Sequence, residues 1–285
     1  MDGFSEGLPP VVFVTGKGGV GKTTVAEGLA AARAVRGMAP TLIEVGEPGD
    51  VLRSRPLPGV RRELLTGEEA LAKAAEELFG SALVSRLVMN SFAVRRLAQA
   101  AAAVRAFAVL DQIRIRARGG RPMIVDLPAT GHGLGWLRAP GQLAELAIAG
   151  RAHEMARRVE RELLVPARSA VVVVTLPEPL VLAETRELTS RLREEAPLGA
   201  HAVVVNGVPR PLPVPPGLPP GSAIAAEAAR RRVRRDARRQ ELARLAGELP
   251  HGALLELPRW PLEPSPETVA AALAGGPSVA EAVAG

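Results

Sequence analysis

A glycine-rich segment near the beginning of the chain, residues 11–24, constrains the fold more than any other part of the sequence. It reads Val-Val-Phe-Val-Thr-Gly-Lys-Gly-Gly-Val-Gly-Lys-Thr-Thr. The apolar run at 11–15 is typical of a strand that is buried on both faces of a parallel sheet. The following loop has the spacing G-x-x-x-x-G-K-[ST], and a helix is expected from about residue 21 to residue 36. A strand, a glycine loop and a helix in this order indicate a phosphate-binding P-loop.

The residues of this loop suit a nucleoside triphosphate that is bound together with Mg²⁺. Its glycines let successive backbone N–H groups approach phosphate oxygens without a Cβ atom in the way. Lys22 is placed to reach the β- and γ-phosphates, and the Thr23 hydroxyl is placed to coordinate Mg²⁺. We therefore predict that ATP and Mg²⁺ bind to the loop made of Gly16, Lys17, Gly18, Gly19, Val20, Gly21, Lys22, Thr23 and Thr24.

The rest of the chain alternates strand-like apolar runs with helical stretches, which predicts an α/β protein. The order of these runs favours a doubly wound, mostly parallel sheet with helices on both faces, in one P-loop ATPase domain over residues 1–285. Residues 51–66, with two prolines, are expected to be irregular. Further strands are expected at 41–45, 123–127, 170–175, 201–205 and 253–257, with a helical subregion at 66–118, a proline-rich loop at 209–221 and a helix at 222–245.

Composition limits the classes of partner. There are 36 Lys and Arg against 30 Asp and Glu, a net charge of +6, which favours acidic partners. Seven arginines between Arg230 and Arg239 form either a solvated helix face or a contact for an acidic partner or anionic lipid. No aromatic residues are interleaved with them, so sequence-specific nucleic-acid recognition is not expected. No signal segment and no uncharged apolar run of membrane-spanning length is found, so the protein is expected to be cytoplasmic.

Three segments of the chain have features beyond the basic P-loop spacing. Lys17 is a second lysine near the start of the loop Gly-Lys-Gly-Gly-Val-Gly-Lys-Thr, the deviant form of the Walker loop. A second segment reads Asp126-Leu-Pro-Ala-Thr-Gly-His-Gly, and residues 175–185 read Thr-Leu-Pro-Glu-x-Leu-x-Leu-x-Glu-Thr. Together they resemble the family of arsenite-pump and tail-anchored-protein-targeting ATPases: the second segment is similar to that family's second switch, and the third looks like the family's segment after the corresponding strand. The resemblance covers residues 11–50 and 122–263, and the chain looks most like the short bacterial members, some of which work as paired subunits.

This resemblance implies an ATPase that opens and closes as a homodimer, or as a heterodimer with a paralogue, and handles a membrane-protein client or a membrane partner. It implies that Lys17 crosses the dimer interface to the partner's nucleotide, and that Asn206 binds the adenine edge. Asp126 ends an apolar strand and would join Thr23 at Mg²⁺. Pro258 begins a loop that is expected near the nucleotide. The residues alone also allow a simpler interpretation, in which Lys17 and His132 are ordinary loop residues and Asn206-Gly207 is only a turn.

The chain departs from the family's pattern in three places. It has no cysteine, so neither the zinc site of the targeting factors nor the arsenite thiolate site can exist. The span 133–169 is too short for the helical insertion that builds the eukaryotic client groove. In the first switch, Gly46 stands where the family has its water-positioning carboxylate, and Glu47 matches only after a shift of one residue. We therefore predict slow hydrolysis, with Glu47 as the candidate catalytic carboxylate.

Two other classes of function remain open from the sequence. One is a partition or positioning ATPase that places its arginine-rich helix on non-specific DNA or on a membrane surface. The other is a subunit that binds ATP without hydrolysing it and regulates an active paralogue. The first shares the two loop lysines, Lys17 and Lys22, but not the Thr-Gly-His segment at 130–132.

Overall fold

The computed structural model describes residues 4, 7–79, 102–128, 133–147, 149–210, 221–249 and 254–275. Seven strands form one sheet in the order β3-β2-β4-β1-β5-β6-β7, and every pairing between neighbours is parallel. The predicted α/β fold with a parallel sheet is therefore confirmed. The strands are β1 (Val11–Gly16), β2 (Thr41–Gly46), β3 (Arg61–Thr66), β4 (Met123–Asp126), β5 (Ser169–Thr175), β6 (Ala200–Val208) and β7 (Leu254–Pro258).

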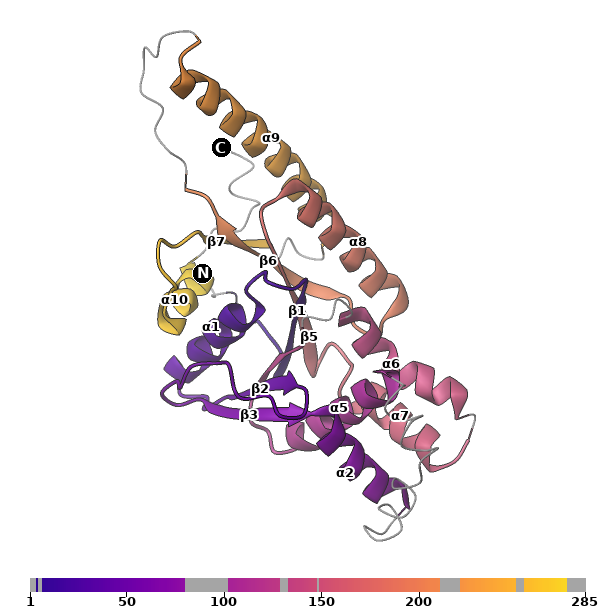
Figure 1. Ribbon diagram of the computed structural model, residues 1–285. Coiled ribbons are helices and arrows are strands. Elements are labelled where there is room, and N and C mark those ends of the chain that lie inside the picture. Colours follow the sequence, from indigo (N-terminus) through magenta and orange to yellow (C-terminus); the bar gives the residue numbers. More distant parts are fainter. Residues whose placement is uncertain are drawn as a thin grey trace.

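Helices cover both faces of this sheet, as Figure 1 shows. One face carries α1 and α10, and the other carries α5, α6, α7 and α8, with α2 outside α5. The described helices are α1 (Lys22–Val35), α2 (Gly67–Phe79), α5 (Ala102–Ala117), α6 (Gly133–Leu146), α7 (Arg151–Glu162), α8 (Pro179–Glu195), α9 (Ala223–Glu248) and α10 (Pro266–Gly275).

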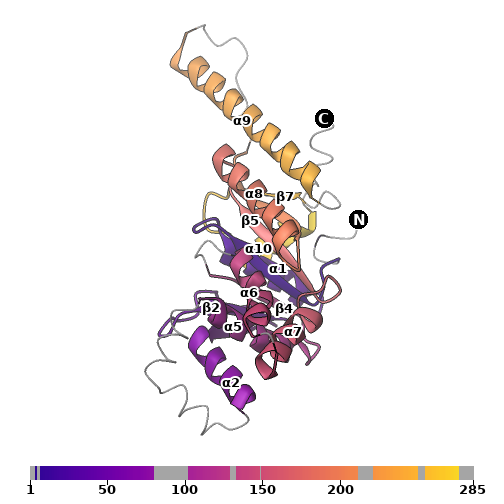
Figure 2. The ribbon, with the colours of Figure 1, turned by 90° about the vertical axis from the view of Figure 1, so that its right-hand side faces the viewer.

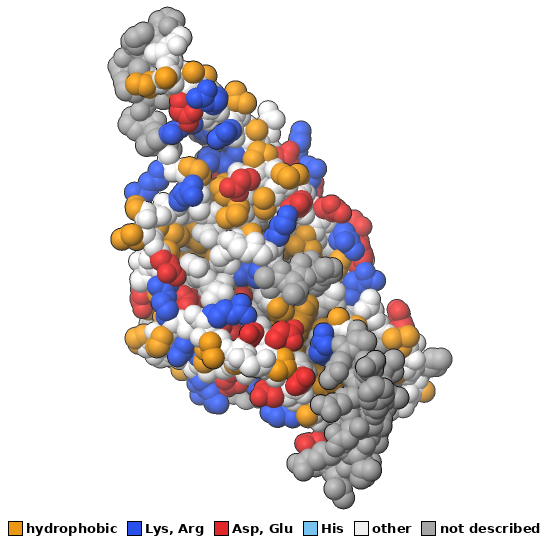
Figure 3. All heavy atoms as spheres, viewed as in Figure 1, with side chains coloured by type: hydrophobic (Ala, Val, Ile, Leu, Met, Phe, Trp, Pro, Cys, Tyr) orange, Lys and Arg blue, Asp and Glu red, His pale blue; other side chains and the backbone are white. Residues whose placement is uncertain are grey.

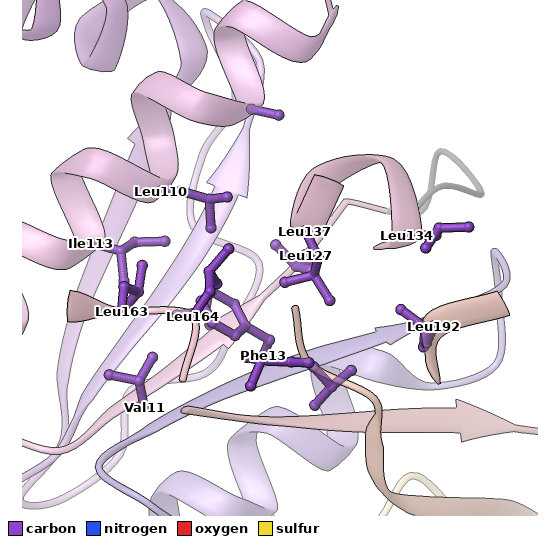
Figure 4. Close-up of a cluster of buried hydrophobic side chains, with 14 of the residues drawn as sticks. Val11, Phe13, Leu110, Ile113, Leu127, Leu134, Leu137, Leu163, Leu164 and Leu192 are labelled. Atoms are coloured by element: carbon purple, nitrogen blue, oxygen red, sulfur yellow. The ribbon is translucent and has the colours of Figure 1, made fainter. Parts of the chain in front are cut away.

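The central strand β1 supplies side chains to two separate apolar cores. Val11 and Phe13 face the core beneath α5–α8, whereas Val12 and Val14 face the core beneath α1 and α10. This alternation follows from the two-residue period of a strand, and it explains why all six residues of β1 are buried. Figure 4 shows Phe13 among leucines that come from several helices and strands. The loop that follows β1 therefore begins from a rigid position in the middle of the sheet.

The edge strand β3 is an element that the sequence prediction missed. Residues 61–66 were expected to be irregular, but they pair with β2 from Arg61↔Thr41 to Thr66↔Gly46. The strand begins Arg-Arg-Glu and buries only Leu65 and Thr66 fully, so it lacks an apolar run. An edge strand can carry such charged residues because one of its sides remains open to solvent.

Other expectations are met only in part. The helical subregion 66–118 is described as α2 and α5, and residues 80–101 lie outside the described part of the chain. Thr66 caps α2, because its hydroxyl accepts a hydrogen bond from the Glu69 amide at 3.3 Å. Strand β6 does not end at Asn206-Gly207 but continues to Val208 through a shift in register. Two predicted segments lie wholly or mostly outside the described residues: Thr130–His132 and the proline-rich loop.

Helix α9 extends away from the sheet as an arm, which both ribbon views show (Figures 1 and 2). Ser222 caps its first turn by accepting a hydrogen bond from the Ala225 amide. Within the helix, Leu242 and Leu245 are the buried residues, and α8 is the neighbour they pack toward. Lys and Arg side chains gather along the arm in the space-filling view (Figure 3). The expected arginine-rich helix is therefore present, with most of its length in solvent.

None of the helices within the described ranges has the length and apolar character that a membrane span requires.

Candidate nucleotide-binding site

The glycine loop lies at the carboxyl end of β1, which is the edge of a parallel sheet where ligands usually bind. Two of its glycines are required by their surroundings. Gly16 has a φ of 145°, and a Cβ atom there would lie 2.2 Å from the Val174 carbonyl oxygen on β5. Gly21 has a φ of 92°, and a Cβ atom there would lie 2.2 Å from the side-chain nitrogen of Asn206. The loop is therefore packed closely against β5 and β6, while residues 17–19 are exposed to solvent.

Lys22 begins α1, and only 7% of its surface is exposed. Its ammonium group donates a hydrogen bond to the Lys17 carbonyl oxygen at 3.0 Å, so it lies under the loop's own backbone. Burial lowers the pKa of Lys22, while the negative charge of Asp126 raises it. A phosphate group would restore the stabilisation that burial removes, because it supplies a second negative charge close to the ammonium group.

Thr23 and Asp126 meet beside this lysine, as the sequence predicts for a pair that holds Mg²⁺. The Thr23 hydroxyl donates to Asp126 Oδ2 at 2.6 Å. Asp126 is 8% exposed, and burial raises its pKa to about 6 although the hydrogen bond from Thr23 and the charge of Lys22 lower it. Its second oxygen, Oδ1, is buried and has no hydrogen-bond partner in the described structure. A buried carboxylate oxygen without a partner, next to a hydroxyl, fits Mg²⁺ and its waters.

Asn206 lies beside the loop, but its amide has a contact that the sequence did not predict. Its side-chain nitrogen donates to the Val20 carbonyl oxygen at 2.9 Å. A hollow of about 300 Å³ extends from this amide along the segment after β7, and its lining includes Thr24, Pro258 and Trp260. Pro258 therefore lies next to Asn206 and Thr24, and the contact with adenine remains a prediction.

Lys17 is the exposed lysine of the loop. Its ammonium group forms an ion pair with Glu184 of α8 at 2.8 Å, and 61% of its side chain is exposed. Gly18 and Gly19 are also exposed, and Val20 is buried in the core beneath α1. The structure thus separates the two lysines, with Lys22 inside the loop and Lys17 on the molecular surface.

The first switch has a different geometry from the one that the prediction about Glu47 requires. Glu47 and Asp50 form a turn, in which the Asp50 amide donates to the Glu47 carbonyl oxygen at 3.0 Å. The Glu47 amide donates to Asp50 Oδ2 at 2.9 Å. Glu47 is exposed, and within the described ranges no hydrogen bond or ion pair joins its carboxylate to Lys22 or Asp126. Glu47 is therefore not part of the cluster that the structure brings together.

Two buried glutamates that sequence reasoning passed over hold the loop after β2. Glu44 accepts hydrogen bonds from the backbone amides of Arg53 at 2.8 Å and Ser54 at 3.0 Å. Glu27 of α1 accepts from the Arg55 amide at 2.6 Å and from its guanidinium at 3.1 Å. A carboxylate inside the apolar strand Thr-Leu-Ile-Glu-Val was a signal for Glu44, because a buried charge needs partners. No local pattern identifies Arg53 or Glu27.

No protein-family model matches the chain. Among curated proteins it is similar to ATPase BagA of Mycobacterium tuberculosis (strain ATCC 25618 / H37Rv) and to "Putative ATPase Mb3704" of Mycobacterium bovis. Each is 30% identical to this chain over 219 residues, which cover 68% of the chain and 64% of the relative. The chain thus spans a little under two thirds of the length of these relatives. The similarity is distant, and it connects the chain to proteins that are named ATPases.

Proposed function

We propose that this chain binds ATP with Mg²⁺ and hydrolyses it slowly, as a dimeric switch ATPase. One observation carries the proposal: Thr23 and Asp126 are joined at 2.6 Å beside a buried Lys22, and Asp126 has a buried oxygen without a partner. Three groups of these types, at the end of a P-loop, are the set that phosphoryl transfer uses. The distant similarity to proteins named ATPases supports the same reading.

Each of these residues has a defined task in the proposal. The loop amides and Lys22 bind and orient the phosphates, so the terminal phosphoryl group is held in one place. Thr23 and Asp126 would hold Mg²⁺, which neutralises phosphate charge when it is bound. Asn206 holds Val20 and thereby the shape of the loop, and the hollow beside it has room for a nucleobase.

Slow hydrolysis follows from the first switch. Gly46 has no side chain, and Glu47 is exposed in a turn that places it outside the cluster. Hydrolysis requires a water molecule that is oriented for attack on the phosphate. The absence of a carboxylate that orients this water lowers the rate of hydrolysis roughly 10²-fold. We infer that Glu47 takes part only after the turn has moved, since catalytic contacts often tighten in the bound state.

Dimer formation and a membrane-related client are the finer parts of the proposal. Their support is the resemblance in the deviant loop and in the second switch, together with the surface position of Lys17. An exposed ion pair such as that of Lys17 with Glu184 can be exchanged for a contact with the nucleotide of a partner subunit. A cytoplasmic location fits the need for ATP.

A second candidate function has an observation of its own in helix α9. The arginine-rich arm suits the phosphates of non-specific DNA or an anionic lipid surface. ATP turnover that rises with DNA and falls steeply with salt would favour this alternative, whereas turnover that ignores both DNA and anionic vesicles would exclude it.

The test of nucleotide binding is calorimetric titration of ATP with and without Mg²⁺, using Lys22→Ala and the matched control Lys73→Ala. Lys73 is an exposed residue of α2 and is the one lysine of the sequence outside the loop. We expect Lys22→Ala to weaken ATP binding about 10²-fold, because charge-assisted hydrogen bonds to phosphate are lost. Lys73→Ala should bind as the parent does. ATP affinity that is equal in all three proteins would refute the P-loop assignment.

A further inference from the structure

The backbone of Arg53 is fixed at the edge of the sheet where the phosphate loop lies. Its amide donates to the buried carboxylate of Glu44, and the Ser54 amide and hydroxyl donate to the same carboxylate. The Ser54 carbonyl oxygen in turn accepts a hydrogen bond from Arg62 of β3. The loop after β2 is therefore held from two strands, although 64% of the Arg53 side chain is exposed.

The anchor of this loop is next to the proposed Mg²⁺ site. Glu44 and Asp126 are register partners on the neighbouring strands β2 and β4. Beyond Glu44, Asp50 folds back over the end of β2, because a Cβ atom on Gly46 would lie 2.9 Å from Asp50 Oδ2. The Arg53 guanidinium lies 3.4 Å from that same oxygen. The guanidinium is thus above the carboxyl end of β2, on the side where the phosphates would bind.

Arg53 is held loosely enough to change partner. Its guanidinium has one contact in the described structure, the 3.4 Å ion pair with Asp50, whose side chain is 38% exposed. Exposed ion pairs of this kind contribute little, because solvent screens them. A phosphate with more than one negative charge and several acceptor oxygens is a stronger partner for the planar guanidinium.

We propose that Arg53 binds the γ-phosphate of the triphosphate and makes the loop after β2 sensitive to its presence. The inference rests on the proposed function and adds a residue to that site. The backbone amides of a P-loop enclose the inner phosphates, and the terminal phosphate faces the loops at the ends of neighbouring strands. This loop holds two arginines, and Arg55 is already paired with the buried carboxylate of Glu27 at 3.1 Å. Arg53, with its exposed side chain, is therefore the cation that the loop can offer to a phosphate.

The test compares Arg53→Gln and Arg53→Lys with the matched control Arg61→Gln. Arg61 is also an exposed arginine, 65% exposed and paired with Glu63 at 2.9 Å. It begins β3 and therefore lies at the amino ends of the strands, whereas the phosphate loop lies at their carboxyl ends. Affinities for ADP and for a non-hydrolysable ATP analogue are measured by calorimetry with Mg²⁺. We expect Arg53→Gln to weaken the analogue about 10-fold and ADP less than about 2-fold. Arg53→Lys should weaken the analogue less than Arg53→Gln does, and Arg61→Gln should change neither affinity.

The outcomes separate this inference from the proposed function. A parent protein that binds neither nucleotide would refute both. A parent that binds both, with an Arg53→Gln variant that binds both equally well, would refute only the assignment of Arg53. An equal loss for ADP and the analogue would also overturn it, because the contact would then not be with the γ-phosphate. Thermal unfolding of Arg53→Gln should match the parent, since its backbone contacts with Glu44 do not depend on the side chain.

Discussion

Replacing Asp126 by Asn should stabilise the ligand-free protein while it removes the proposed Mg²⁺ site. Asn is neutral and nearly the same size, and its carbonyl oxygen can still accept the hydrogen bond from Thr23. In the parent, burial raises the pKa of Asp126 to about 6, because a charge is kept away from water without enough compensation. The ionised carboxylate therefore costs stability unless a cation is bound.

The size of this effect depends on pH in a direction that follows from the pKa. Below pH 3.8 the carboxyl is neutral in both the folded and the unfolded chain, so it costs nothing. As the pH rises from 3.8 to 6, the unfolded chain loses its proton first, and the free energy of unfolding falls. Above pH 6 the loss is complete. A pKa difference of about 2.2, at about 1.4 kcal/mol per pKa unit, gives an upper value of about 3 kcal/mol.

The assay is urea unfolding of ligand-free parent and Asp126→Asn proteins at pH 4 and at pH 8. We expect the variant to be more stable by about 1–3 kcal/mol at pH 8 and by less than about 1 kcal/mol at pH 4. Asp236→Asn is the control, because Asp236 is 60% exposed on α9, and it should change stability by less than about 0.5 kcal/mol. A destabilisation by Asp126→Asn that is the same at both pH values would refute the reasoning.

Three further predictions concern the loop and the first switch. Gly16→Ala should lower the free energy of unfolding by about 3 kcal/mol or more, because Gly16 has a positive φ and a Cβ atom there would meet the backbone of β5. Gly19→Ala should lower it by about 1 kcal/mol, because Gly19 also has a positive φ but has open space around it. Equal losses for the two variants in urea unfolding would contradict this. A mixture of Lys17→Ala and Lys22→Ala proteins should lose ATP hydrolysis non-additively. If light scattering finds that the protein stays monomeric with ATP while it turns ATP over normally, the cross-subunit contact is excluded. Glu47→Gln should lower the single-turnover rate by less than about 10²-fold with ATP affinity kept, because the parent makes this contact only after the turn has moved. An unchanged rate would remove Glu47 from catalysis.

Much of the fold was predictable because its signals are local. The apolar run of β1, its glycine loop and the helix that follows are contiguous, so the residue types and their spacing are enough to predict them. The same is true of the cap of α2 by Thr66. Strand β3 was missed because Arg61 and the next two residues carry charge, and only pairing with β2 makes them a strand.

The candidate site was predictable in three members, Lys22, Thr23 and Asp126, but not in its contacts. Asp126 was expected beside Thr23 because Thr23 ends the glycine-loop motif and Asp126 ends an apolar strand. The contact of Asn206 with Val20 joins residues far apart in the sequence, so no local pattern indicates it. Arg53 was missed for the same reason, since its place depends on a carboxylate nine residues earlier that is buried only in the folded chain.

The projecting helix α9 also has a mechanical consequence. The part from Ala223 to Leu242 is about 29 Å long at 1.5 Å per residue, and among the described residues its buried side chains, Leu242 and Leu245, lie near its base. Two long ion pairs from Arg186 of α8, at 3.8 and 3.7 Å, tie that base to the helix that also carries Glu184, the partner of Lys17. A rotation of α8 by about 10° would therefore sweep the far end of the arm through about 5 Å. Such a rotation would make the arm a lever that converts a small displacement beside the phosphate loop into a larger one at its far end.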